Sequence, residues 1–191
     1  MSRKFLAAVF AFGLASAASA QEADGPGPNL ILDVAGQASG RIVIDLLPDL
    51  APKAVDQIVA LAREGAYDGI VFHRVIEGFM AQTGDVQFGK KGGDTSLAGM
   101  GGSTRPDLPA EFSNVPFTRG VVGMARADSP NSANSQFFIM LAPEYPSLDG
   151  GYTVVGRVIS GMEVVEAIRK GDARLNGLVD NPDYISAASV R

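Results

Sequence analysis

Two segments of the chain combine large apolar side chains with long polar ones at spacings that suit a binding site. They are residues 72–82 (FHRVIEGFMAQ) and 134–139 (NSQFFI). Three apolar side chains could line a pocket and three polar ones could donate hydrogen bonds around its rim: Phe79, Met80 and Phe138, then Arg74, Gln82 and Gln136. Taken singly, each of these residues is better explained by core packing or by a solvated strand position. The two segments together therefore carry the prediction of a small-ligand or peptide site.

The strand pattern around Arg74 sets which side chains can act with it. If residues 72–76 form a regular strand, His73 points to the opposite face from Arg74, and Phe72 points to the same face as Arg74. His73 is the chain's one histidine, so a multi-histidine metal site is excluded. A serine hydrolase would have to use His73 as its base, and the chain has no G-x-S-x-G elbow.

Composition narrows the class of protein further. The chain has 191 residues, a formal net charge of −5 and no cysteine. The absence of cysteine excludes disulfides, thiol nucleophiles and thiolate zinc sites, and the acidic balance argues against a nucleic-acid binder. Four aspartates lack calcium-loop spacing and are interpreted as surface and turn groups: Asp149, Asp172, Asp180 and Asp183. Neither a metal nor another cofactor is expected.

The N-terminus predicts export. Arg3 and Lys4 precede an apolar stretch at 5–14, and small residues follow up to Ala18-Ser19-Ala20. We expect a signal peptide at 1–20, a flexible Gly- and Pro-rich lead-in at 21–28 and one domain at 29–191. The alternative, an uncleaved membrane anchor, is disfavoured because the apolar stretch is short for a bilayer span. The mature protein would be periplasmic in a Gram-negative source and secreted otherwise, with no membrane attachment.

Many short strands and two helices are predicted for the domain. A helix is expected from Pro52 to Gly65, and a second from a capping box at Ser160 and Glu163 to Gly171. Glycine-rich residues 84–102 are expected to form a long surface loop. Strand-like apolar runs occupy residues 29–34, 40–47, 70–76, 121–125, 136–141, 152–159 and 184–190. This pattern is typical of a mainly β fold, a closed β-barrel with helices covering its ends.

The sequence resembles the cyclophilin family over about residues 29–190. The strings FHRVI-x-GFM-x-Q, G-x-V-x-MAR, N-SQFFI, LDG and VVGRV-x-x-GM occur in this order with compatible spacing. The resemblance implies a closed eight-stranded antiparallel β-barrel capped by two α-helices. It also implies peptidyl-prolyl cis-trans isomerisation of proline-containing unfolded or flexible polypeptides.

The resemblance assigns roles to ten residues. Arg74 matches the catalytic arginine of the family. The other nine match positions that form the proline pocket, contact the substrate backbone or flank the pocket: Phe79, Met80, Phe138, Leu148, Gln82, Ala125, Arg126, Gln136 and Tyr152. Because the reaction moves no proton, a structural or hydrogen-bonding role is expected for His73.

Three positions depart from the family pattern. Ser147 stands where a tryptophan is common, Tyr152 where a histidine is common, and Arg126 where many members have asparagine. The missing tryptophan predicts weakened binding of cyclosporin-type inhibitors.

Several functions remain open from the sequence. An active foldase for exported proteins is favoured over a non-catalytic module that holds proline-containing segments, because a pure binder would not need Arg74. A holdase-type chaperone would need a large exposed apolar patch, which the sequence does not show. A monomer is expected, since no association motif is present.

Overall fold

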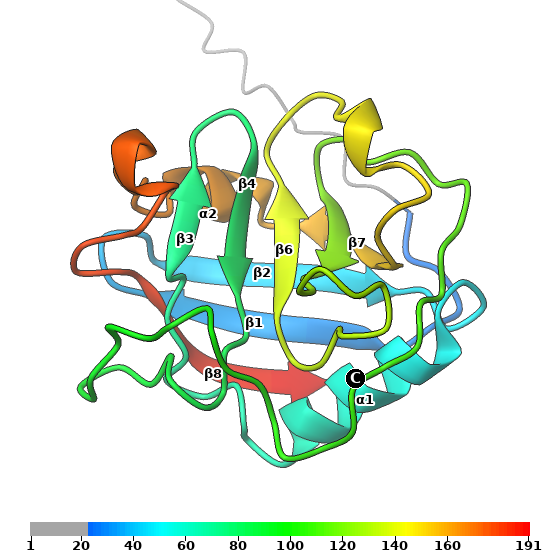
Figure 1. Ribbon diagram of the computed structural model, residues 1–191, viewed down its shortest axis with the longest axis horizontal. Helices are drawn as coiled ribbons and strands as arrows, with labels where there is room; N and C mark the ends of the chain where they lie inside the picture. Colours follow the sequence, from blue (N-terminus) through cyan, green and yellow to red (C-terminus); the bar gives the residue numbers. More distant parts are fainter. Residues whose placement is uncertain (1–22) are drawn as a thin grey trace, which may run out of the picture.

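The computed structural model describes residues 23–191 (Figure 1), so the expected signal peptide at 1–20 lies outside the described residues. This part of the chain forms eight strands, two α-helices and two short 3-10 helices. In chain order these are β1 Asn29–Ala35, β2 Gly40–Leu46, α1 Pro52–Arg63, β3 Arg74–Ile76, β4 Met80–Thr83, β5 Val121–Met124, β6 Phe137–Met140, η1 Pro146–Leu148, β7 Val154–Ser160, α2 Met162–Ala167, η2 Ala173–Leu175 and β8 Tyr184–Val190. None of the helices among residues 23–191 has the length and apolar character needed to cross a membrane.

The strands form one antiparallel sheet in the order β3-β4-β6-β5-β7-β2-β1-β8. Figure 1 shows β3, β4 and β6 running steeply, whereas β2, β1 and β8 run across the view, so the sheet curls over on itself. The mainly β architecture with eight antiparallel strands and two helices was predicted. The predicted closure of the barrel is wrong, because the sheet is an open half-barrel whose edges are β3 and β8.

A loop, and not another strand, occupies the outer edge of β3. Val75 donates its N–H to Gly177 O (2.8 Å), and Gly171 donates to Val75 O (2.8 Å). Val179 also donates to His73 O (3.1 Å). These bonds satisfy edge groups that would otherwise template another strand. The segment 171–179, called here the 171–179 loop, thus covers the outer edge of β3, while β8 bonds to the residues just before β3, with Ile185 N donating to Ile70 O (2.8 Å).

The two helices differ in how well sequence predicted them. Helix α1 begins at Pro52 and ends just before Gly65 as expected, and its apolar face packs towards β8. Helix α2 is shorter than expected and packs towards β2. The predicted capping box is wrong, because Ser160 is the last residue of β7 and the N-cap is Gly161 with φ of 90°. A left-handed residue without a side chain turns the chain there, so no hydroxyl caps the helix.

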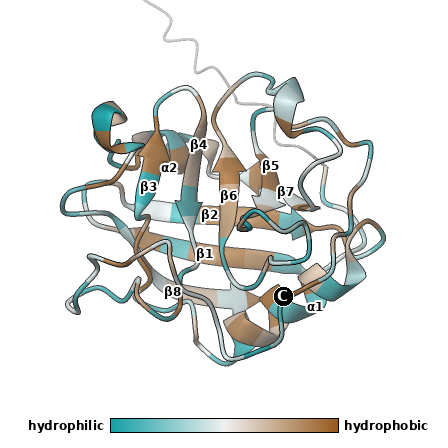
Figure 2. Cartoon of the chain, in the orientation of Figure 1, coloured by the Kyte–Doolittle hydropathy of each residue, from teal (hydrophilic) through white to brown (hydrophobic). Residues whose placement is uncertain are grey.

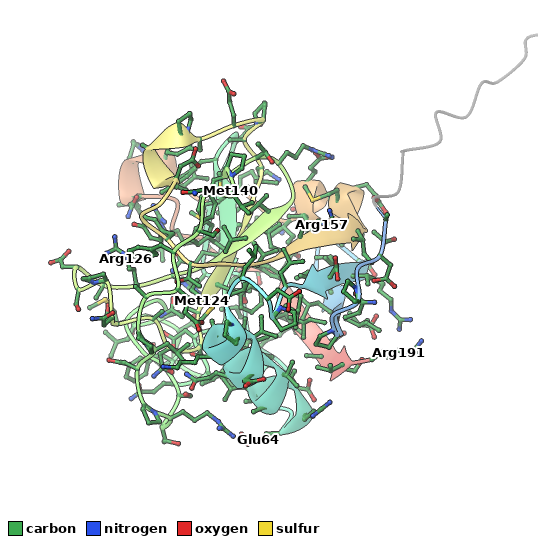
Figure 3. All side chains as sticks on the ribbon, turned by 90° about the vertical axis from the view of Figure 1, so that its right-hand side faces the viewer. Glu64, Met124, Arg126, Met140, Arg157 and Arg191 are labelled. Atoms are coloured by element: carbon green, nitrogen blue, oxygen red, sulfur yellow. The ribbon has the colours of Figure 1, made fainter. Side chains whose placement is uncertain are left out.

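The sheet carries a separate hydrophobic cluster on each face. Successive side chains of a strand point to opposite faces. In β6, Phe137 and Ile139 enter the main core with the apolar faces of α1 and α2, whereas Phe138 and Met140 belong to a second, smaller cluster. Figure 2 shows the apolar colouring concentrated on the strands, and Figure 3 shows Met124 and Met140 in the interior. The smaller cluster is the base on which a surface site can be built.

Residues 23–28, from the expected lead-in, lie against β2 and β7. Pro28 O accepts from Leu46 N (3.0 Å), and Arg157 Nη2 reaches both Ala23 O (2.8 Å) and Asp45 Oδ2 (3.3 Å). Asp45 is fully buried. The contact therefore covers a buried carboxylate with chain that precedes the first strand.

The interpretation of Asp183 as a surface group is wrong. Its side chain is buried and accepts hydrogen bonds from the backbone N–H groups of Gln37, of Ala38 (3.1 Å) and of Arg169 (2.7 Å). One carboxylate thus joins the β1–β2 turn to the chain that follows α2. Nothing in the local sequence pattern reveals these partners, which lie far away along the chain.

Asp183→Ala should lower the free energy of unfolding by about 3 kcal/mol, because it leaves buried donors without their charged acceptor. Urea unfolding followed by circular dichroism measures the change. Asp180→Ala, a neighbouring exposed aspartate, is the control. Equal, small losses for both variants would contradict the role given to Asp183.

Candidate active site

The register of the sheet places three of the predicted site residues in one row. Arg74 in β3 faces Gln82 in β4, and Gln82 faces Phe138 in β6. Phe138 in turn faces Gly123 in β5, where a Cβ would come within 2.7 Å of both the Phe138 and Phe117 rings. Glycine at this position therefore makes the room that the aromatic rings occupy. Residues far apart in the sequence meet here because the strands carry them across one face.

A small cavity lies on this row, with a volume of about 110 Å³. Its lining contains all of the predicted site residues except Gln136: Arg74, Phe79, Met80, Gln82, Ala125, Arg126, Phe138, Leu148 and Tyr152. Met80, Phe138 and Leu148 are buried members of the smaller hydrophobic cluster. Gln136 lies next to the cavity and bonds to Gln82. The fold therefore gathers the predicted residues, while their contacts with substrate stay a prediction.

Aromatic and cationic groups form the walls of the cavity. The Phe138 ring stacks on Phe117 at 5.7 Å, and Tyr152 meets Phe138 edge-on at 5.8 Å. The Arg126 guanidinium lies 4.5 Å from the Tyr152 ring centre, and Figure 3 shows Arg126 at the edge of the molecule. These contacts hold the apolar walls at fixed positions before any ligand enters.

A chain of hydrogen bonds links Arg74 to the buried carboxylate of Asp85. Arg74 Nη1 donates to Gln82 Oε1 (3.2 Å), and Gln82 Nε2 donates to Gln136 Oε1 (2.9 Å). Gln136 Nε2 donates to the carbonyls of Gly99 (3.0 Å) and Gly101 (2.8 Å). The N–H groups of these two glycines donate to Asp85 Oδ2, at 2.7 and 2.9 Å. Each glutamine side-chain amide accepts one bond and donates the next, so these bonds strengthen one another. At Gly99 and Gly101 the accepting carbonyl and the donating N–H belong to different peptide groups, so Asp85 acts there by holding the backbone in place.

The other side of the Arg74 guanidinium is held by Asn176. Nε donates to Asn176 O (3.0 Å), and Nη2 donates to Asn176 Oδ1 (3.0 Å). Nη1 donates one of its two hydrogens to Gln82 Oε1 and lies beside the cavity, 4.0 Å from Met80 Sδ. Partial burial lowers the pKa of Arg74, yet an arginine remains charged at any physiological pH. The site thus holds a fixed cation beside an apolar pocket.

Comparisons with known proteins bear on what such a site does. The family described as cyclophilin type peptidyl-prolyl cis-trans isomerase/CLD matches residues 31–190. The chain belongs to the cyclophilin-type peptidyl-prolyl cis-trans isomerases. A probable peptidyl-prolyl cis-trans isomerase of Brucella suis is 55% identical over 186 residues, which are 96% of this chain and 92% of that protein.

Solved cyclophilins share the fold. A cyclophilin from Hirschia baltica matches with a TM-score of 0.69 and 27% identity, covering 86% of this chain and 74% of its own. A cyclophilin of Cryptosporidium parvum, solved in the presence of the dipeptide Ala-Pro, matches with a TM-score of 0.70 and 26% identity. It covers 85% of this chain and 98% of its own. The chain is therefore an isomerase that acts on proline-containing peptides.

His73 of this cyclophilin is buried against the 84–102 loop. Its ring lies near Gly99, where an added Cβ would come within 3.1 Å of it. Phe72 lies in the main core, so the expectation that it shares a face with Arg74 is wrong. The regular strand begins at Arg74, and Val71 before it bridges to Tyr184 instead. Among residues 23–191, no group of three or more acidic or histidine side chains could hold a metal ion.

Three further residues shape the site and were not predicted. Asp85 orders the 84–102 loop, because its Oδ1 also accepts from Gln87 N (3.0 Å) and Phe88 N (2.9 Å). Tyr145 stacks on Phe79 at 4.4 Å, two residues before Ser147. Asn176 has a left-handed backbone, with φ of 53°. The Asn-Gly pair at 176–177 is a recognisable turn pattern, but the sequence contains nothing that points this turn at Arg74.

The stability of the cyclophilin should depend on pH through His73. Burial lowers its pKa from 6.5 to about 4, although the nearby Asp85 carboxylate opposes the shift. Between these pH values the unfolded chain binds a proton that the folded chain does not. The free energy of unfolding should therefore fall on acidification from pH 6.5 to pH 4, by up to about 3 kcal/mol. In His73→Gln this share of the slope should vanish in urea titrations; an unchanged slope would contradict a neutral, buried His73.

Asn176→Gly should lower kcat about tenfold and change KM little. Glycine keeps the left-handed backbone and the carbonyl that accepts from Nε, but removes the side-chain acceptor of Nη2. Asn181→Gly is the matched control, because Asn181 has the same backbone conformation, with φ of 50°. In an Arg74→Ala background, Asn176→Gly should have no further effect; a full loss there would show a role independent of Arg74.

Proposed function

We propose that this cyclophilin seats the proline ring of an X-Pro segment in the 110 Å³ cavity and donates a hydrogen bond from Arg74 Nη1 to the prolyl nitrogen. We further propose that its substrates are exported proteins during folding. The observation that supports the first proposal is the restraint of Arg74 by Asn176 and Gln82, which leaves Nη1 beside the apolar cavity.

The physical problem is the rotation of a partial double bond. Resonance gives the peptide C–N bond a rotational barrier of about 18–20 kcal/mol, and X-Pro exchange takes roughly tens to hundreds of seconds. In the twisted state resonance is lost, and the prolyl nitrogen regains a localised lone pair. A guanidinium N–H aimed at that nitrogen finds an acceptor only in the twisted state. Its interaction is therefore stronger in the transition state than in the ground state, which is the condition for catalysis.

The magnitudes are within reach of such a site. A million-fold acceleration needs about 8 kcal/mol of differential stabilisation. Half-burial of Arg74 strengthens its electrostatic interaction, and prior restraint by Asn176 and Gln82 removes the cost of ordering the side chain during reaction. No group must gain or lose a proton. The catalytic rate should therefore not depend on the protonation of His73.

Holding the flanking chain confines rotation to one bond. The rim groups proposed for this task are Gln82, Gln136, Arg126 and the backbone at Ala125, which surround the cavity or bond to its lining. A relative from Cryptosporidium parvum was solved in the presence of the dipeptide Ala-Pro, which supports a short X-Pro segment as the ligand. The ring enters the apolar cavity, and the polar rim fixes the chain on either side.

Arg74→Ala should reduce kcat/KM for a short X-Pro peptide by about 100-fold or more, because the donor to the prolyl nitrogen is lost. Arg74→Lys should recover little, since lysine cannot reproduce the planar fork that Asn176 holds. Exchange NMR on the chain from Gln21 onwards measures both, with circular dichroism as the check on folding. Equal rates for wild type and a folded Arg74→Ala would overturn the proposed role.

The proposal of exported substrates is supported by the N-terminal sequence, where two basic residues, an apolar stretch and Ala18-Ser19-Ala20 follow in order. Cleavage after Ala20 would leave a chain with 14 basic and 21 acidic residues, since the leader contains two of the 16 basic residues and no acidic ones.

Expression of the full chain in a Gram-negative host should yield periplasmic protein whose first residue is Gln21, as measured by mass spectrometry after osmotic shock. Ala18→Glu together with Ala20→Glu should block processing, because the cleavage site requires small residues. Full-length protein confined to the cytoplasm would contradict export.

A further inference from the structure

Exposed apolar side chains gather beside Arg74. In the part of the chain that the structure describes, six large apolar side chains are exposed: Leu97, Met100, Phe112, Tyr145, Leu175 and Leu178. Met100 (80% exposed), Leu175 (59%) and Leu178 (48%) line one hollow of about 230 Å³. Half of the exposed set thus meets at a single place. Apolar surface grouped in this way on a soluble protein marks an interaction site more often than scattered residues do.

The hollow lies between two loops that flank the active site. Met100 comes from the 84–102 loop, which is held by Asp85, and Leu175 and Leu178 come from the 171–179 loop. The 171–179 loop is fixed to β3 by its backbone, including Val75 N to Gly177 O at 2.8 Å. Both walls are therefore attached to the same framework that positions Arg74.

The hollow adjoins the proline cavity. Arg74 and Gln82 line both spaces, so a chain whose proline enters the cavity has the hollow as its neighbour across the guanidinium. The hollow is about 230 Å³ and the cavity about 110 Å³. A space that is larger than the one proposed for a proline ring has room for a leucine or phenylalanine side chain.

We propose that this hollow is a second subsite, which binds one large apolar side chain of the same polypeptide whose X-Pro bond lies over Arg74. The proposal rests on the proposed function, because it uses the seating of proline in the cavity. Unfolded polypeptides expose apolar residues that folded ones bury, so the subsite favours unfolded substrates. The shared residues Arg74 and Gln82 make the substrate chain itself the occupant, rather than a second copy of the protein.

A peptide series tests the subsite on the chain from Gln21 onwards. The reference octapeptide contains one proline and has serine at all seven remaining positions. Each further peptide has one leucine in place of one serine, at a position from three before to three after the proline. Burial of one leucine at the right position should raise kcat/KM about five- to thirty-fold over the all-serine peptide. The other positions should give changes smaller than this.

Variants locate the effect. Leu175→Ser combined with Leu178→Ser should abolish the preference for leucine at the favoured position. Leu97→Ser is the matched control, because Leu97 is 53% exposed on the 84–102 loop but does not line the hollow. It should leave both the basal rate and the preference unchanged. A preference that survives in the double variant, or no preferred position in the wild type, overturns the subsite.

A binding measurement separates this inference from the catalytic one. The methyl resonance of Met100, assigned with Met100→Leu, should shift on adding the leucine peptide and not on adding the all-serine peptide. If the wild type isomerises the all-serine peptide without any leucine effect, the subsite fails while the proposed function stands. If no peptide is isomerised, the proposed function fails, and the Met100 shift alone decides whether the hollow binds apolar side chains.

Discussion

A charged guanidinium held half-buried in one orientation is the constraint on which the rest of the site depends. Arg74 keeps its charge at a cost in desolvation, which is why its pKa is lowered. The cost is offset by acceptors on both sides: Asn176 takes Nε and Nη2, and Gln82 begins a chain of bonds that ends on Asp85. The Asp85 carboxylate holds the backbone at Gly99 and Gly101, whose carbonyls accept from Gln136 and so position the amide that binds Gln82. The same carboxylate orders the 84–102 loop, so the loop and the arginine are fixed by one network.

The curled sheet explains how an apolar pocket can lie on the surface of a small protein. Alternate residues of β4, β5 and β6 serve the main core on one face and the smaller cluster on the other. Phe137 packs edge-on against Tyr67 in the core, whereas its neighbour Phe138 lines the cavity. The pocket walls are therefore backed by strands that the core already holds rigid. Because the walls of such a pocket are already ordered when it is empty, binding a ligand costs little conformational entropy of the protein.

The open edge of the half-barrel has a functional consequence. The outer edge of β3 has no strand partner and is bonded to the 171–179 loop. Because the loop fills that edge instead, it delivers Asn176 to the arginine and presents Leu175 and Leu178 to solvent beside it. One departure from ideal barrel geometry thus supplies both the restraint on Arg74 and the walls of the hollow.

The sequence by itself determined the mainly β architecture with two helices and the first helix with its ends. It also named nine residues that line the cavity, but none of the predicted apolar runs covered the short strand β4. Apolar periodicity, Pro52 and Gly65 are local features, and the spacing of FHRVI-x-GFM-x-Q and N-SQFFI is specific enough to nominate residues such as Arg74, Gln82 and Phe138. Predictions from local sequence pattern were wrong where a contact with a distant residue determined the structure. Ser160 was read as a helix cap but pairs with β2, and Asp183 was read as a surface group but binds N–H groups more than 100 residues away at Gln37 and Ala38. Only the tertiary structure decided that the barrel stays open, that Asn176 reaches Arg74 and that Asp85 ends the hydrogen-bond chain. Each of these outcomes depends on contacts between residues far apart in the sequence, and such contacts produce no periodic pattern in the sequence.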